Sequence, residues 1–142
     1  AATIVPGVPA VGGMMVRGAD VGAKAKQLYQ NLINGLRRQD ETTAELKSTF
    51  PGASVQNEQY LRTADGKRAI DPLTGTARRV DHVVIQNGKG RTYETTSMGA
   101  NKVQQFRKEE RIRGNGGTFI RDRNTEGLVD TGKAVSEVKR VR

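Results

Sequence analysis

Residues 78–97 read RRVDHVVIQNGKGRTYETTS, and they predict two β-strands joined by a tight turn. Asn87-Gly88 is a strong hairpin signal, because a two-residue type I′ turn needs positive φ at both central positions. With these two residues in the turn, Gln86 pairs with Lys89. Counting back along both strands then places Asp81 directly opposite Glu94, so each strand contributes one acid to the same face.

The acid pair predicts a metal site. Directly opposed residues hold their Cβ atoms about 4.5–5.5 Å apart, and two carboxylates at that separation repel unless a cation lies between them. Asp81 and Glu94 are therefore expected to bind a divalent ion. The alternative is that both acids lie on a solvated edge and pair with Arg78, Arg79 or Arg91, as surface ion pairs commonly do.

A metal-dependent hydrolase also needs a cation near the reacting phosphate, and often a third acid. A lysine two positions after Glu94 would supply the cation, but Thr96 stands there; Lys102, expected one turn into the next helix, is the nearest substitute. For the third acid, Glu58 is preferred because it lies on a strand among apolar residues. Glu41 and Glu45 on the preceding helix remain alternatives.

Composition narrows the ligand chemistry. The chain has 142 residues, a formal charge of +9, no cysteine and one histidine. Thiolate and histidine-rich metal sites are excluded, so any site must use oxygen ligands, which suit Mg²⁺, Mn²⁺ or Ca²⁺. The histidine, His82, follows Asp81 and points to the opposite face, where it is expected to be packed and hydrogen-bonded. No apolar run reaches membrane-spanning length.

The order of predicted elements gives the fold class. Residues 1–19, broken by Pro and Gly, predict a linker, and residues 20–142 a single domain. Helix is expected from Asp20 and again from Asp40 to Phe50, a strand over 55–62, the hairpin, a helix over 97–112 and a strand over 118–121; residues 135–141 are ambiguous. This αβββαβ order predicts an α/β (α+β) fold, a mixed sheet with flanking helices.

Positive charge gathers around the hairpin and the helix that follows it. Such a cluster would neutralise phosphates, and Arg78, Arg79 and Arg91 are expected to help hold a nucleic-acid backbone. The chain is only 4% aromatic, so base stacking is not expected to be the main grip, which favours a structured, double-helical backbone. The alternative is a solvated basic face balanced by Glu109 and Glu110.

Asp81 followed by Glu94-Thr95-Thr96, on the second and third strands, resembles the PD-(D/E)xK nuclease superfamily. More narrowly, RRVDHVVI, YETTS and NKVQQ (residues 101–105), with Lys108-Glu109, look like C-terminal nuclease domains of bacterial polymorphic toxins, above all those of contact-dependent growth inhibition systems. The similarity covers roughly residues 50–125. It implies a restriction-endonuclease-like core and a nuclease that uses Mg²⁺ or Mn²⁺, with Zn²⁺ as an alternative.

By position, the resemblance makes Asp81 and Glu94 the metal ligands and Lys102 a displaced motif lysine. It implies cleavage of tRNA in preference to DNA by a secreted or surface-delivered toxin that acts in the cytoplasm of a target bacterium. A cognate immunity protein would block the monomeric toxin as a heterodimer. The alternatives are a DNase of the same fold, a non-catalytic basic nucleic-acid-binding module, and a structural piece of a secretion or phage machine that binds no metal.

Overall fold

A computed structural model describes residues 19–142, and the chain divides into two compact units between Arg37 and Arg38. Each unit is considered by itself; the functional residues discussed below all belong to the second. The predicted linker over residues 1–19 lies, apart from Ala19, outside the described residues. Within the described part of the chain, no helix is both long and apolar enough to cross a membrane.

The first helix, α1 (Ala19–Thr49), is continuous, so the predicted break before Asp40 is wrong. No proline falls inside this range, and Gly35 alone costs a helix only about 1 kcal/mol relative to alanine. An N-cap residue such as Asp40 favours a helix start, but inside an uninterrupted helix its backbone is already hydrogen-bonded. The helix ends before Pro51, as predicted.

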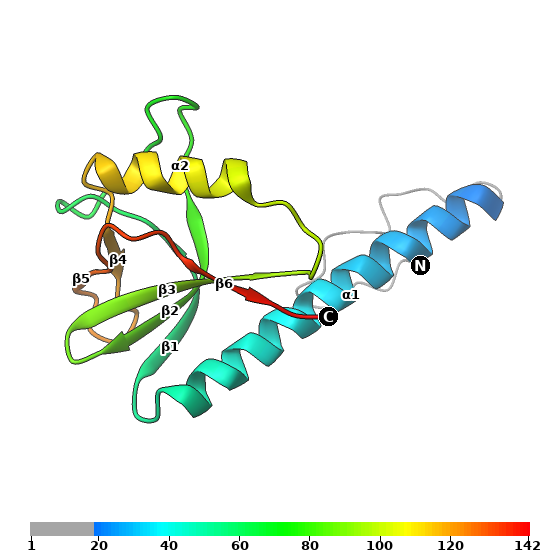
Figure 1. The fold of residues 1–142 in the computed structure, drawn as a ribbon, viewed down its shortest axis with the longest axis horizontal. Helices are drawn as coiled ribbons and strands as arrows, with labels where there is room; N and C mark the ends of the chain where they lie inside the picture. The colour runs from blue at the N-terminus through cyan, green and yellow to red at the C-terminus, as the bar shows by residue number, and fades with distance from the viewer. Residues whose placement is uncertain (1–18) are drawn as a thin grey trace. The chain divides into compact units, whose positions relative to one another are not determined.

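The central sheet has the strand order β1-β2-β3-β6. Its strands are β1 (Ser54–Tyr60), β2 (Arg79–Gln86), β3 (Lys89–Thr96) and β6 (Glu137–Arg140). The first three are antiparallel neighbours, whereas β6 runs parallel to β3 (Figure 1). This arrangement confirms a mixed sheet with helices in an α+β class.

The hairpin forms with the predicted register. Gln86 lies opposite Lys89, and the turn residues Asn87 and Gly88 have φ values of 55° and 75°. Both central positions are therefore left-handed, as a type I′ turn requires.

Helix α2 spans Val103–Gly114, so the predicted start at Ser97 is wrong. Lys102 is the N-cap and makes no capping hydrogen bond with its own side chain, while Asn101 Oδ1 accepts from the N–H of Val103 at 3.0 Å. The segment before the helix is held by a different contact: Arg140 Nη1 donates to the carbonyl oxygens of Ser97, Met98 and Ala100 at 3.1, 3.2 and 3.0 Å. Carbonyls bound to a guanidinium on β6 leave this segment as a turn.

The predicted strand over 118–121 forms as β4 (Phe119–Arg121), but it belongs to a separate two-stranded sheet with β5 (Leu128–Asp130). The strand that returns to β3 after α2 is β6, in the segment whose sequence was ambiguous.

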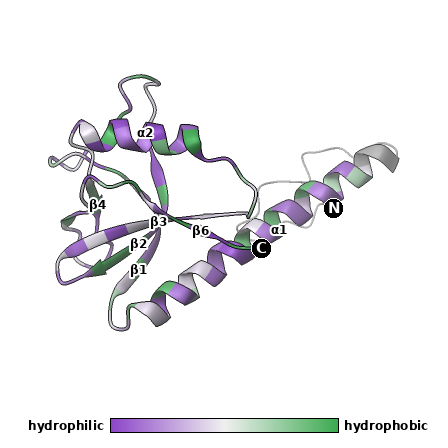
Figure 2. Ribbon diagram, viewed as in Figure 1, coloured by the Kyte–Doolittle hydropathy of each residue, from purple (hydrophilic) through white to green (hydrophobic). Residues whose placement is uncertain are grey.

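Apolar side chains cover both faces of the central sheet, and β2 is hydrophobic over much of its length (Figure 2). On one face, Leu46 from the end of α1 packs with Val84 and Tyr93. On the other, Ile112 of α2 and residues of β4 and β5 join Val83 in a second cluster. Glu94 lies on this second face, where Gln105 of α2 contacts it.

Candidate active site

Asp81 and Glu94 lie where the hairpin ladder stops. The last paired residues of β2 and β3 are His82 and Tyr93, and Asp81 and Glu94 are the next residues along each strand. Pairing between β1 and β2 also skips this level, where Glu58 has a φ of 57°. Both ladders are thus interrupted around Asp81.

At this level the side chain of Asp81 binds the backbone of β3. Its Oδ2 accepts a hydrogen bond from the backbone N–H of Thr95 at 3.0 Å. Among residues 19–142, no hydrogen-bond donor contacts its other oxygen, Oδ1. The half-buried side chain is therefore anchored through one oxygen.

Glu94 is only 2% exposed and has three partners of mixed type. Its Oε2 accepts from Arg78 Nη2 at 3.0 Å. Its Oε1 accepts from Gln105 Nε2 at 3.2 Å and lies 4.0 Å from Lys102 Nζ. The last two partners come from α2 and its N-cap, so the crossover helix brings them to the strand.

The pKa of the Glu94 carboxyl is raised from 4.5 to about 7, because burial and the nearby negative charge of Asp81 together outweigh the opposing effects of Arg78 and Lys102. The positive charges of Arg78 and Lys102 therefore do not fully offset the effect of burial on the pKa of Glu94. The influence of Asp81 also shows that the two acids are close enough to repel.

Arg78, which contacts Glu94, belongs to a buried network of ion pairs that was not predicted from the sequence. Arg78 Nε donates to Glu109 Oε1 at 3.2 Å, and Arg113 Nε donates to Glu109 Oε2 at 3.0 Å. The Ser136 N–H also donates to Glu109 Oε2, at 2.5 Å. Glu109 and Arg113 are 0% and 1% exposed. Removing one member would leave an opposite charge buried without compensation.

This network changes the role of Arg78. The prediction placed it on a nucleic-acid backbone, but its side chain is 5% exposed and lies between Glu94 and Glu109. A buried guanidinium with two carboxylate partners has no access to a phosphate. The prediction for Arg78 is corrected accordingly: it is an internal counter-charge that orients Glu94.

Glu58 is not brought into the acid pair. Its side chain is 53% exposed and lies 4.0 Å from Arg79 Nη2, which is itself exposed. Within the described residues, no group of three or more His, Cys, Asp or Glu side chains could hold a metal ion. The left-handed backbone of Glu58 turns the residue out of the regular ladder, which strand periodicity cannot foresee.

The other predicted residues lie elsewhere. Arg91 places its guanidinium 5.7 Å from the Phe50 ring, on the face packed by α1 and away from Glu94. Glu45 pairs with Lys139 at 3.2 Å, and Glu41 is an exposed residue of α1. Thr96 is buried and accepts the N–H of Val141. Lys102, by contrast, lies near Glu94, with its Nζ 4.0 Å from Oε1.

His82 is packed and hydrogen-bonded on the opposite face, as predicted. Its Nδ1 lies 3.0 Å from Asn57 Oδ1, and its Nε2 lies 2.5 Å from Thr95 Oγ1. Burial lowers the pKa of the imidazole, although Asp81 opposes this effect. Burial thus favours the neutral imidazole, and His82 contacts Thr95, whose N–H in turn binds Asp81.

The spacing of Gln105, Glu109 and Arg113, which were not predicted as site residues, was a signal available in the sequence. Lys102, Gln105, Glu109 and Arg113 recur at spacings of three and four, which places them along one side of a helix. Glu109 and Arg113 also have the spacing of a helical ion pair. The interpretation of Glu109 as a solvated acid missed that this side also carries Ile112 and faces the sheet.

Three comparisons with known proteins returned no relatives: no protein-family model, no curated protein and no solved structure matches the chain. The functional argument therefore depends on the geometry around Asp81 and Glu94.

Proposed function

We propose that this chain is a metal-dependent endonuclease that hydrolyses phosphodiester bonds in nucleic acid. The single observation that carries the proposal is the position of Asp81, which binds the N–H of Thr95 beside Glu94 on the neighbouring strand, with Lys102 Nζ 4.0 Å from Glu94. Two repelling carboxylates with a lysine beside them are the groups that metal-assisted phosphate chemistry uses.

The donor set fits a hard divalent ion. Asp81 Oδ1 has no donor among the described residues, and the pKa of Glu94 stays raised despite two neighbouring cations. Oxygen ligands favour Mg²⁺ or Mn²⁺, with Zn²⁺ as an alternative. Once bound, such an ion activates water and stabilises the charge that develops on the phosphate.

The residues of the chain orient these groups. Arg78 and Gln105 fix the two oxygens of Glu94, and Glu109 holds Arg78 from behind. The Thr95 N–H fixes Asp81. Lys102, 28% exposed, would orient the attacking water or stabilise negative charge on the phosphate.

The positive net charge of the chain supports a polyanionic substrate. The chain carries +9, and such a charge promotes association with nucleic acid. In the proposed family assignment the core is restriction-endonuclease-like, tRNA is favoured over DNA, and the protein acts as a toxin inside a target bacterium until an immunity protein binds it. Three antiparallel strands followed by α2 and, after the separate β4-β5 sheet, by β6 parallel to β3 support this core.

The test incubates purified protein with total tRNA and with plasmid DNA, in Mg²⁺, in Mn²⁺ and in EDTA. Asp81→Asn keeps an oxygen that can accept from Thr95 but removes the negative charge. Asp65→Asn, in an exposed turn, is the matched control. We expect metal-dependent cleavage by the wild type and the control, and a loss of at least about 100-fold in Asp81→Asn.

Binding separates an enzyme from a basic binding module. Asp81→Asn should bind nucleic acid at least as tightly as the wild type, because a repulsive charge has been removed. If neither polymer is cut in any metal, or if Asp81→Asn cuts as fast as Asp65→Asn, the proposed activity is refuted.

A further inference from the structure

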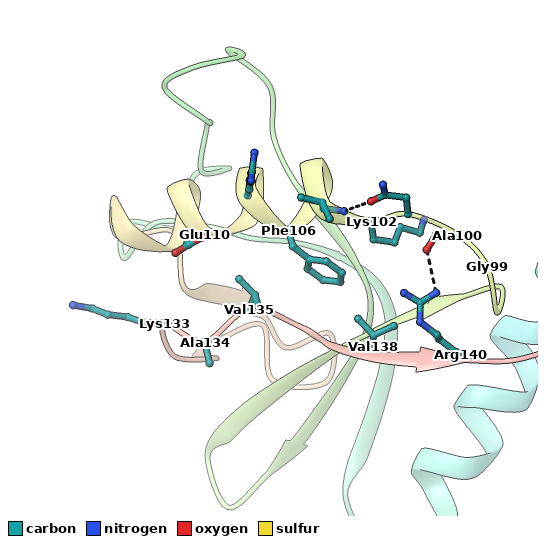
Figure 3. A pocket seen from close by; sticks show the side chains of 13 residues that line it. Gly99, Ala100, Lys102, Phe106, Glu110, Lys133, Ala134, Val135, Val138 and Arg140 are labelled. Atoms are coloured by element: carbon teal, nitrogen blue, oxygen red, sulfur yellow. Dashed lines mark hydrogen bonds between the residues drawn. The ribbon is translucent and has the colours of Figure 1, made fainter.

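A groove with an apolar floor lies between the start of α2 and β6 (Figure 3). The ring of Phe106 points from α2 toward Val135 and Val138, and Val103 also lines the groove. Val103 and Val135 are 50% and 40% exposed. These side chains leave a concave apolar surface in an otherwise hydrophilic helix.

The rim of the groove is basic. Lys102, Arg107, Lys133 and Arg140 line it, against a single acid, Glu110. Arg140 is occupied by three backbone carbonyls and shapes the wall. Within residues 19–142, Arg107 and Lys133 have no ion-pair partner and so are available to phosphates.

The groove continues from the proposed active site. Lys102 lines the groove and also lies 4.0 Å from Glu94 Oε1. A nucleic acid held at Glu94 would therefore lie beside Lys102, one of the residues that line the groove. The groove shares Lys102 with the proposed active site, and most of its charged lining residues are basic. We therefore take its occupant to be part of the nucleic-acid substrate.

A nucleic acid offers an apolar surface only where a base is unstacked and unpaired, because a duplex hides its base faces. We propose that the groove binds one unpaired base next to the cleaved phosphodiester, with its flanking phosphates on Arg107 and Lys133. The inference rests on the proposed nuclease function and names its substrate class: single-stranded or looped nucleic acid rather than continuous duplex.

The test measures equilibrium binding of three labelled probes to Asp81→Asn protein in EDTA: a single-stranded 10-mer, an abasic 10-mer of equal charge, and a duplex. Stacking on one aromatic ring predicts about 5- to 150-fold tighter binding of the strand with bases than of the abasic strand. Phe106→Ala should abolish this ratio, while Leu73→Ala, at an exposed turn, should keep it.

Val103→Asp is a second groove variant at an exposed position, so it tests the surface if Phe106→Ala fails to fold. It should reduce the ratio without changing the urea unfolding midpoint. Equal binding of abasic and intact strands, tighter binding of duplex, or a dimer that Val103→Asp dissociates would each overturn the inference. Cleavage that depends on Asp81 while the base ratio is absent would refute the groove and leave the proposed function intact. The reverse result would refute the nuclease function, and with it the position of the base beside a cleaved bond, and would leave only the binding of an unpaired base.

Discussion

Metal binding should depend steeply on pH because Glu94 must lose its proton to act as a ligand. Burial and the charge of Asp81 raise the pKa of this carboxyl to about 7. With that pKa, about 97% of the groups are ionised at pH 8.5 and about 3% at pH 5.5. The apparent affinity for Mg²⁺ should therefore fall about 30-fold between these pH values.

Urea unfolding measures this effect. With Mg²⁺ at ten times its dissociation constant at pH 8.5, the free energy of unfolding should rise by about 1.4 kcal/mol, and by only about 0.2 kcal/mol at pH 5.5 with the same Mg²⁺ concentration. Glu94→Gln should remove the stabilisation at both pH values. Glu110→Gln, on the exposed side of α2, controls for the loss of one carboxylate.

The protein without metal should show the opposite trend. Because folding raises the Glu94 pKa, the contribution of this group to stability is present below pH 4.5 and is lost as the pH rises through about 7. The loss amounts to about 3 kcal/mol relative to Glu94→Gln. Equal Mg²⁺ affinity at pH 5.5 and 8.5, or full Mg²⁺ stabilisation of Glu94→Gln, would refute the reasoning.

Three further predictions concern the surrounding structure. Glu109→Gln should lower the free energy of unfolding by about 3–5 kcal/mol in urea titrations, because two arginines lose a buried counter-charge; a change no larger than that of Glu110→Gln would contradict this. Gly117→Ala should cost about 1–3 kcal/mol, because its Cβ would lie 2.5 Å from Ile112 Cγ2, whereas a Cβ at Gly114 meets nothing within 4 Å; equal melting temperatures for the two alanine variants would argue against it. Lys102→Met should lower kcat by about 100-fold or more with little change in nucleic-acid affinity; an effect on affinity alone would make Lys102 a binding residue.

The central hairpin could be predicted from sequence because its turn is a local device. Asn87-Gly88 sets its own backbone conformation, and the register with Gln86 opposite Lys89 follows from it. The level of Asp81 and Glu94 on the two strands follows by counting. The packed position of His82 follows from the alternation of side chains along a strand.

Helix boundaries and strand partners were less predictable. Ser97 is a favourable N-cap, but the carbonyls of its segment bind Arg140, forty-three residues later in the chain. The strand that pairs in parallel with β3 follows α2 in the chain. Residues 118–121 and 135–141 were both candidates, and the sequence pattern did not decide between them. Only the folded chain selects Glu137–Arg140 and leaves Phe119–Arg121 to a separate sheet.

The sequence by itself determined the hairpin turn, its register as far as His82 and Tyr93, the lack of cysteine and the basic charge, because these depend on neighbouring residues or on composition. The tertiary structure alone decided the surroundings of the acids. It buried Arg78 against Glu94 and Glu109, excluded Glu58, and brought Lys102 to Glu94 through α2. Burial and ionic pairing depend on which distant segments pack together, and the same arginine or glutamate is equally compatible with water until that packing exists.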